Sequence, residues 1–244
     1  MSETDPSVAV VGGGVSGLTA ATFTARAGLD TTVFDAGEPI VARNAHLENV
    51  PGFPAGVNAR TFLSLSREQA GEAGASFREE RVTDVSADGD GFVVTGDDEY
   101  AFDYLVAASW SDPEYLEGTG VEFIEQGSKT YVETGENGRT GVDGLYAAGR
   151  LAGRYHQTVV AAGSGAEAAL SLVEDSDVAF YHDWVAPEGY FTGRDRPLPP
   201  GCEEIPEDER EERERASRER MREAFADPQS EPPTMHPSVE TDGD

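Results

Sequence analysis

The sequence predicts an α/β fold with a doubly wound, Rossmann-like parallel sheet, and two stretches near the N-terminus carry this prediction. The first is Val8–Ala21, VAVVGGGVSGLTAA, in which a short buried strand passes through a glycine turn into a helix. The second is Thr31–Asp35, TTVFD, a further strand that ends in an acidic residue 18 positions after Gly17. A strand, a glycine turn, a helix and a second strand with a terminal acid form a dinucleotide-binding unit.

The pattern Gly-x-Gly-x-x-Gly lies across the first strand–helix junction, and each glycine has a physical role. Gly12 permits the tight turn, Gly14 leaves room for a pyrophosphate, and Gly17 lets the helix pack close to the strand. The free N–H groups at the start of the helix then point at the phosphates, and Asp35 can accept hydrogen bonds from an adenosine ribose. The alternative is a glycine turn in another kind of α/β protein. We predict a dinucleotide site that includes Gly12, Gly13, Gly14, Val15, Ser16, Gly17, Asp35 and Ala36.

The composition is strongly acidic. The 244 residues carry 47 acidic and 18 basic side chains, a formal net charge of -29, and Lys129 is the only lysine. Such a surface repels nucleic acids and anionic membranes, so we expect neither as a partner. Acid-rich, lysine-poor surfaces are typical of proteins that work at high salt, where screening weakens self-repulsion.

The cysteine content and the N-terminal residues exclude several further classes of protein and site. A single cysteine, Cys202, cannot form an internal disulfide, a CxxC redox pair or a cysteine metal cluster, and we predict no metal site. The N-terminal MSETDPS is acidic and polar, unlike a signal peptide. No apolar run approaches the roughly 20 residues needed to cross a bilayer. We therefore expect a soluble cytoplasmic protein.

The middle of the chain is predicted to alternate loops with short elements. Residues 37–54 are polar and punctuated by prolines, which predicts an irregular loop over the carboxyl ends of the strands. His46 in this loop is either a surface residue, which we favour, or a catalytic group. Beyond the loop we predict a helix over Arg60–Gly74, a three-stranded β-meander (Arg81–Ser86, Phe92–Thr95 and Tyr100–Phe102), a strand at Tyr104–Ala108, and irregular structure to Gly144 with one strand near Thr130–Glu133.

A second strand–loop–helix unit follows within Gly144–Leu172, GLYAAGRLAGRYHQTVVAAGSGAEAALSL. The buried strand Leu145–Ala148 meets Gly149, and an alanine-rich helix begins near Thr158. Gly149 allows close backbone approach, and the helix N-terminus supplies hydrogen-bond donors to a ligand. An ordinary βα unit is the alternative, but two such units in one chain favour the ligand interpretation.

The remaining residues change in character. Residues 180–191 are rich in aromatic side chains, which are usually buried. They pack on the domain itself, form a lid, or make a homodimer contact, and these alternatives stay open. Residues 203–226 are almost all Glu and Arg, which predicts a solvated helix. We divide the chain into a dinucleotide-binding domain (residues 1–178), an aromatic extension (179–202), the charged helix (203–226) and a disordered acidic tail (227–244).

Three ordered stretches together resemble the FAD domain of the thioredoxin-reductase-like flavoproteins. They are VVGGGVSGLTAA with FDAG, then ENVPGFP (Glu48–Pro54), then GLYAAGR…HQTVVAAGSGAEAA (Gly144–Ala169). The resemblance covers roughly residues 7–172. It implies that the cofactor is FAD, with its pyrophosphate on the first motif and its adenosine ribose on Asp35. It further implies that Asn49 lies near the flavin ring, that the Val82 backbone faces the adenine, and that Gly149 and Gln157–Val159 (Gln157, Thr158, Val159) meet the ribityl chain and flavin edge.

The chain also departs from the family pattern. The family inserts an NAD(P)H domain, which carries the CxxC pair, where this chain has only the short span Ala108–Gly144. Arg150 replaces a family aspartate whose carboxylate accepts from a ribityl hydroxyl, whereas a guanidinium can only donate. Arg150 either costs that contact or instead binds a phosphate or a flavin oxygen. Ala107-Ala108-Ser109 replaces the family's Ala-Thr-Gly.

Two functions are compatible with these features. The first is a one-domain FAD-dependent oxidoreductase that is not a true thioredoxin reductase, with flavin reduced by free NAD(P)H, by substrate or by another protein. Its catalytic residues are unknown, and Asn49, His46 and His156 are candidates by position only. The second is a non-catalytic FAD or dinucleotide-binding module that senses or docks a partner. An NAD(P)-dependent dehydrogenase fits less well because the chain has no Tyr-x-x-x-Lys set.

Overall fold

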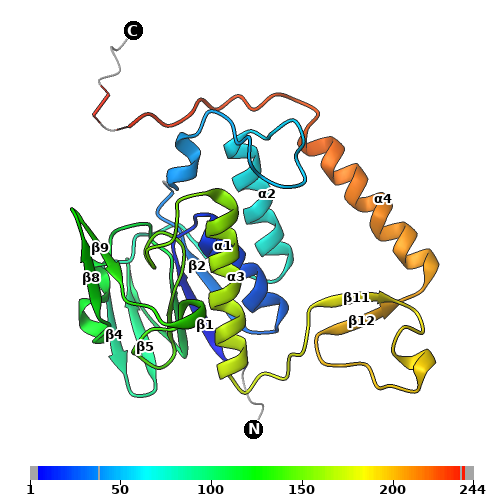
Figure 1. The fold of residues 1–244 in the computed structure, drawn as a ribbon, viewed down its shortest axis with the longest axis horizontal. Coiled ribbons are helices and arrows are strands. Elements are labelled where there is room, and N and C mark those ends of the chain that lie inside the picture. Colours follow the sequence, from blue (N-terminus) through cyan, green and yellow to red (C-terminus); the bar gives the residue numbers. More distant parts are fainter. Residues whose placement is uncertain (1–4, 38, 237, 240–244) are drawn as a thin grey trace.

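The centre of the protein is a five-stranded parallel sheet (Figure 1). The computed structural model describes residues 5–37, 39–236 and 238–239. In register, Val8 of the central strand lies opposite Thr31 on one side and Tyr104 on the other. The strand order is β10 (Leu145–Ala147), β7 (Tyr104–Ala107), β1 (Ser7–Val11), β2 (Asp30–Phe34) and β3 (Ser76–Arg78).

The two faces of this sheet are covered by different layers. Val8 and Val10 of β1 point into a core shared with helices, whereas Ala9 and Val11 point into a core shared with a β-meander. This alternation is the period of two that a strand imposes on its side chains, and both layers flank the sheet in Figure 1. The helical layer comprises α1 (Val15–Arg26), α2 (Ala59–Glu72) and α3 (Thr158–Asp175), and the meander comprises β4 (Asp84–Asp88), β5 (Gly91–Thr95) and β6 (Glu99–Phe102).

The predicted α/β class with a Rossmann-like parallel sheet is confirmed, and four local predictions need correction. The sheet gains a fifth strand, β3, which is too short and too polar for its pattern to reveal. The meander begins at Asp84, not Arg81. The loop at 37–54 contains a 3-10 helix, Ile40–Arg43, and its Leu47 pairs with Val57. The span after β7 contains a 3-10 helix, Glu114–Thr119, and a hairpin of two strands, β8 (Phe123–Gln126) and β9 (Lys129–Val132), instead of one strand.

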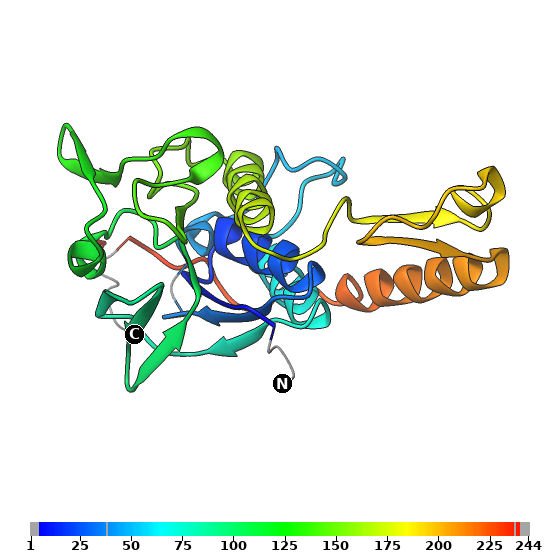
Figure 2. The same cartoon turned by 90° about the horizontal axis from the view of Figure 1, so that it is seen from below.

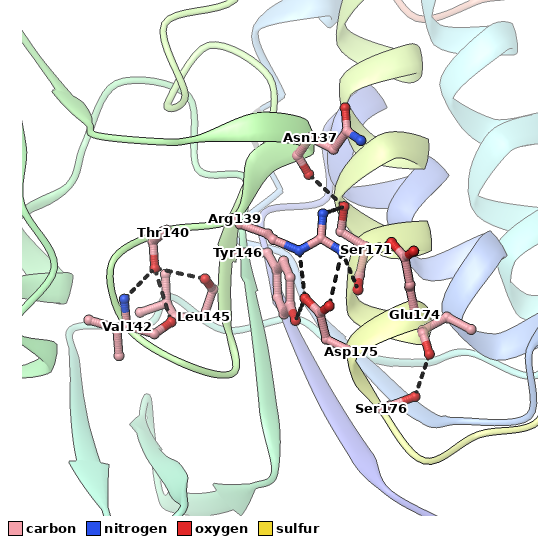
Figure 3. A network of polar contacts seen from close by, with 11 residues as sticks. Asn137, Arg139, Thr140, Val142, Leu145, Tyr146, Ser171, Glu174, Asp175 and Ser176 are labelled. Atoms are coloured by element: carbon pink, nitrogen blue, oxygen red, sulfur yellow. Dashed lines mark hydrogen bonds and ion pairs between the residues drawn. The ribbon is translucent and has the colours of Figure 1, made fainter.

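At the amino-terminal edge of the sheet, a polar cluster fixes β10 to the last turn of α3 (Figure 3). Arg139 donates from Nε to Asp175 Oδ2 at 2.7 Å and from Nη2 to Glu174 Oε2 at 2.8 Å. The Tyr146 hydroxyl donates to the same Asp175 oxygen at 2.9 Å. The hydrogen bond from Arg139, opposed by burial and aided by Tyr146, lowers the pKa of Asp175. The cluster orients α3, whose other end reaches the candidate site.

The C-terminal part forms an arm, residues 184–224, that projects from the body (Figure 2). Strands β11 (Trp184–Pro187) and β12 (Cys202–Ile205) pair in parallel and lead into α4 (Glu207–Ala224). The charged helix therefore begins at Glu207, because residues 203–205 belong to a strand.

The aromatic side chains of the extension pack mainly on one another. The Trp184 ring centroid lies 4.6 Å from that of Tyr190 and 5.5 Å from that of Phe191. Arg26 of α1 pairs with Asp183, the residue just before the arm, and Arg220 of α4 pairs with Glu68 of α2, so ion pairs with the body lie at both ends of the arm.

Two further sequence predictions concern the C-terminal tail and membrane-spanning segments. Of the predicted tail 227–244, residues 227–236 and 238–239 contain neither helix nor strand, and the rest lies outside the described residues. Within the described ranges, no helix has the length and apolar character needed to cross a membrane.

Candidate functional site

A cavity of about 730 Å³ opens at the carboxyl ends of the parallel strands. Its wall takes residues from the segment after each of four strands: Gly12–Ser16 after β1, Asp35 after β2, Ser109 after β7 and Arg150 after β10. In open α/β sheets this edge is where ligands bind. The loop at 39–49, residues 80–82 after β3, the span after β7 and the start of α3 also line the cavity.

The glycine turn has the geometry that close approach of a ligand requires. Gly12 has φ +119°, and a Cβ there would lie 2.6 Å from the carbonyl oxygen of Ala108. A Cβ on Gly17 would collide with the carbonyl oxygen of Gly12, so α1 can pack on the turn only without a side chain. A Cβ on Gly14 would meet nothing within 4 Å, because that position faces the open cavity. The turn is therefore a cradle whose open side is at Gly14.

Two helices begin at the cavity with their first N–H groups free of side-chain caps. The N-cap of α1 is Gly14 and that of α3 is Gln157, and neither makes a side-chain capping bond. Neither helix has an acidic residue in its first turn. Val15, Ser16 and Thr158 line the cavity. Uncapped N–H groups and the positive ends of two helix dipoles make the cavity favourable for an anion.

Asp35 stands directly against the turn. Its Oδ2 accepts from Arg67 Nη1 at 2.7 Å, and its Oδ1 accepts from the backbone N–H of Gly37 at 2.9 Å. A Cβ on Gly13 would collide with this carboxylate and would displace it from its present position. Each carboxylate oxygen can accept more than one bond, and both therefore retain capacity for a ligand hydroxyl.

The polar residues of the loop and of the α3 N-terminus meet across the cavity. Asn49 Nδ2 donates to Gln157 Oε1 at 2.8 Å. His46 Nδ1 lies 2.8 Å from Glu48 Oε1, so the imidazole is paired within its own loop. The His156 ring packs edge-on against Trp110, with centroids 6.1 Å apart. All of these residues line the cavity.

Arg150 is held at the cavity wall by Tyr131 of β9. Its guanidinium lies over the tyrosine ring, 4.9 Å from the centroid, and Nη2 donates to the tyrosine hydroxyl. Among the ion pairs between described residues, none involves Arg150, nor Arg43 and Arg81, which also line the cavity. The lining also contains the carboxylates of Asp35, Glu48, Glu80 and Asp112, so the cavity carries charges of both signs.

Most of the residues predicted from the sequence line this one cavity. They are Gly12, Gly13, Gly14, Val15, Ser16, Asp35, Ala36, Asn49, Val82, Arg150, Gln157 and Thr158, together with His46 and His156. Gly17 and Gly149 instead act in packing, since a Cβ on Gly149 would lie 2.5 Å from Ser16 Oγ. Val159 lies outside the cavity lining and is 42% exposed.

Some lining residues lie outside the predicted set, and two of them, Arg43 and Glu48 of the ENVPGFP stretch, had a signal in the sequence. Trp110 and Tyr115 come from the span after β7, which has no periodic pattern. Arg43 was visible as a basic residue in a polar loop. In the part of the chain that the structure describes, no group of three or more His, Cys, Asp or Glu side chains is placed to hold a metal ion.

Comparison with known proteins adds independent evidence. Residues 3–165 match the family model for pyridine nucleotide-disulphide oxidoreductases. Thioredoxin reductase from Aquifex aeolicus is 39% identical over 85 residues, 33% of this chain and 26% of that protein. Thioredoxin reductase from Mycolicibacterium smegmatis is 32% identical over 126 residues, 50% of this chain and 40% of that protein. The chain thus matches less than half the length of either relative.

The fold agrees with this assignment. The crystal structure of T. acidophilum thioredoxin reductase aligns with a TM-score of 0.65 at 18% identity, covering 71% of this chain and 99% of that one. At 18% identity this structural similarity is evidence for the fold only. The family match covers most of the chain and includes the glycine turn and the start of α3. The chain therefore belongs to the pyridine nucleotide-disulphide oxidoreductase family, as the resemblance to thioredoxin-reductase-like proteins implied.

Proposed function

We propose that this chain is an FAD-dependent oxidoreductase of the thioredoxin-reductase-like type, built on a single dinucleotide domain. The observation that carries the proposal is the Gly12–Gly17 cradle, whose open side at Gly14 faces a cavity of about 730 Å³. This volume is within the range of ligand sites. When bound, FAD supplies the redox chemistry, and the protein supplies binding and orientation.

Different residues of the cavity would bind different parts of FAD. The uncapped N–H groups of Val15 and Ser16, at the cavity wall, would hold the pyrophosphate. Asp35 accepts from the adenosine ribose, and the Val82 backbone faces the adenine. On the other side, the Asn49–Gln157 pair and Thr158 take the flavin half.

Arg150 is the site residue that departs most from the family pattern. Its guanidinium is fixed on Tyr131 and has no carboxylate partner among the described ion pairs, so it is available to a phosphate or carbonyl oxygen. We propose this role over a lost ribityl contact. The electron donor is free NAD(P)H, the substrate or a redox protein, because the chain contains one cysteine and one glycine fingerprint.

A second candidate is a non-catalytic FAD-binding module. The single cysteine and the short span between β7 and β10 favour it, since neither provides a redox pair or a second nucleotide site. One experiment separates the two candidates. Purified FAD-loaded protein is mixed with NADH or NADPH without oxygen, and the yellow absorbance is followed. Rapid bleaching supports an enzyme reduced by nicotinamide cofactor, whereas an unchanged spectrum with both NADH and NADPH supports the module.

A further inference from the structure

One residue of the cavity wall adopts a backbone conformation that its side chain disfavours. Trp110 has φ +66°, in the left-handed region. The other non-glycine residues with positive φ in the described ranges are Asn137 and Asp195. Asn and Asp tolerate this region, whereas for a bulky residue it is a genuine outlier. The strain at Trp110 therefore needs a reason.

Burial does not provide that reason. The Trp110 side chain is 37% exposed and lines the cavity, so it is not a core anchor. Its only described aromatic partner is the edge of His156, 6.1 Å away and itself exposed. A large apolar ring left beside a ligand cavity, with a strained backbone, is the pattern found at binding sites.

The backbone on both sides of Trp110 is fixed. The N–H of Ala108 donates to the carbonyl of Val11 at 2.8 Å, which ties the end of β7 to β1. The Ser109 Oγ lies 3.0 Å from the carbonyl oxygen of Asp112 and 3.0 Å from the hydroxyl of Tyr115. Tyr115 is buried. These bonds fix the chain next to residue 110.

The position of Trp110 relative to the glycine turn selects which half of a dinucleotide it meets. In the sheet order, Asp35 follows β2 on one side of β1, and Trp110 follows β7 on the other side. With the adenosine ribose on Asp35, the ligand half beyond the pyrophosphate lies on the β7 side. His156, the partner of Trp110, precedes Gln157, which holds Asn49.

From this geometry we propose that Trp110, with His156 behind it, is a binding residue that packs against the isoalloxazine ring of the flavin. The proposal rests on the FAD site described above and deepens it. The bonds of Ala108 and Ser109 place the backbone of residue 110 at the cavity wall before the cofactor arrives, which lowers the ordering cost of binding. Gly, Asn or Asp would relieve the strain and lose the aromatic contact.

The test uses the full chain and three variants: Trp110→Asn, Trp110→Phe and, as a matched control in the arm, Trp184→Phe. FAD affinity is measured by ultrafiltration at high salt, the melting temperature is measured without FAD, and the emission of bound flavin is recorded. An excited flavin is quenched by a tryptophan in contact with it and is not quenched by phenylalanine.

We expect Trp110→Asn to raise the melting temperature by about 2–4 °C, because it relieves a left-handed backbone. We expect it to weaken FAD binding about 3- to 10-fold, the range of one aromatic contact. Bound flavin should emit more strongly in both Trp110 variants than in wild type or Trp184→Phe. If Trp110→Asn does not fold, the emission of Trp110→Phe decides.

Unchanged flavin emission in the Trp110 variants overturns the inference. So does FAD affinity in Trp110→Asn equal to that of wild type. Either result leaves the FAD site itself intact. If the wild-type chain does not bind FAD, the proposed function fails, and the role of Trp110 fails with it.

Discussion

A hydrogen bond of 2.8 Å from Asn49 Nδ2 to Gln157 Oε1 joins the cavity loop to the N-terminus of α3. The two residues are 108 positions apart in the chain. Both are exposed, so the bond adds little to the stability of the fold. What it does is fix the two amide groups relative to each other at the flavin half of the proposed site.

We therefore predict that Asn49→Ala weakens FAD binding by about 3- to 10-fold, the loss of one or two neutral hydrogen bonds. Gln157→Ala should give a similar loss, and the double variant should lose less than the sum, because the two side chains act as a pair. Asn58→Ala is the control. It removes the N-cap of α2, so it should lower the melting temperature and leave binding unchanged. Strictly additive losses in the cycle would contradict a shared role.

The glycine turn offers a matched pair of variants. Gly14→Ala places a methyl group in the open cradle, so FAD binding should fall by about 10-fold or more. Its cost in stability should be about 0.5–1 kcal/mol, because alanine is a poorer N-cap residue than glycine. Gly17→Ala should instead lower mainly the stability of the fold.

At Gly17 the new methyl would collide with the carbonyl oxygen of Gly12. The free energy of unfolding should fall by about 1–3 kcal/mol, as in other overpacked sites. Denaturant unfolding without FAD and ultrafiltration with FAD measure the two quantities. A Gly14→Ala variant that binds FAD like wild type would show that the pyrophosphate does not lie in this cradle.

Replacing Arg150 tests the residue that departs most from the family. Since its guanidinium is held at the cavity wall by Tyr131, we predict that Arg150→Asp weakens FAD binding by about 10-fold or more. The new carboxylate would repel the pyrophosphate, and Arg150→Lys should lose less. Equilibrium binding at two salt concentrations measures the effect. Tighter binding by Arg150→Asp would show instead that the arginine costs a ribityl contact.

Lowering the pH should destabilise the arm, because it protonates the Glu204 carboxylate. Burial raises the pKa of Glu204, but hydrogen bonds from the backbone of Phe191, the hydroxyl and backbone of Thr192 and the backbone of Gly189 outweigh it, and the pKa falls to about 2. In the unfolded chain the pKa is about 4.3. The carboxylate thus stabilises the arm above pH about 4.3, and the contribution is lost as pH falls through about 2.

Trp184 reports this change because it packs against Tyr190 and Phe191 beside the carboxylate. We predict that its emission changes between pH 4.5 and 2 in a Trp110→Phe background. With Glu204→Gln added, the arm should already be looser at pH 6, and its emission should change less over that range. Identical acid profiles with and without Glu204→Gln would argue against the role of this carboxylate.

How much the sequence could predict depended on the kind of element. The parallel strands and α1 were predictable because their apolar side chains recur at the period that each element imposes. Strand β3 was not, since its three residues have no period and it is held by pairing with β2. The same holds for β11 and β12, which pair across 14 intervening residues of turns.

At the site, the glycine turn, Asp35 and the α3 N-terminus were predictable from local motifs, and Asn49 was predicted from the resemblance to the family. Trp110 was not, because its importance comes from a backbone angle and from a neighbour, His156, 46 positions away. Arg150 was recognised as a departure, but its contact with Tyr131 depends on β9, a strand that the pattern indicated only weakly. Contacts between residues that are distant in the sequence become visible only in the folded structure.

The central claim is that this chain holds FAD in the Gly12–Gly17 cradle. The most direct test is the visible spectrum of the purified protein after incubation with FAD at high salt and removal of free cofactor, run beside Gly14→Ala. We predict about one flavin per wild-type chain and much less in the variant. Colourless wild-type protein, or equal flavin in both proteins, would contradict the claim.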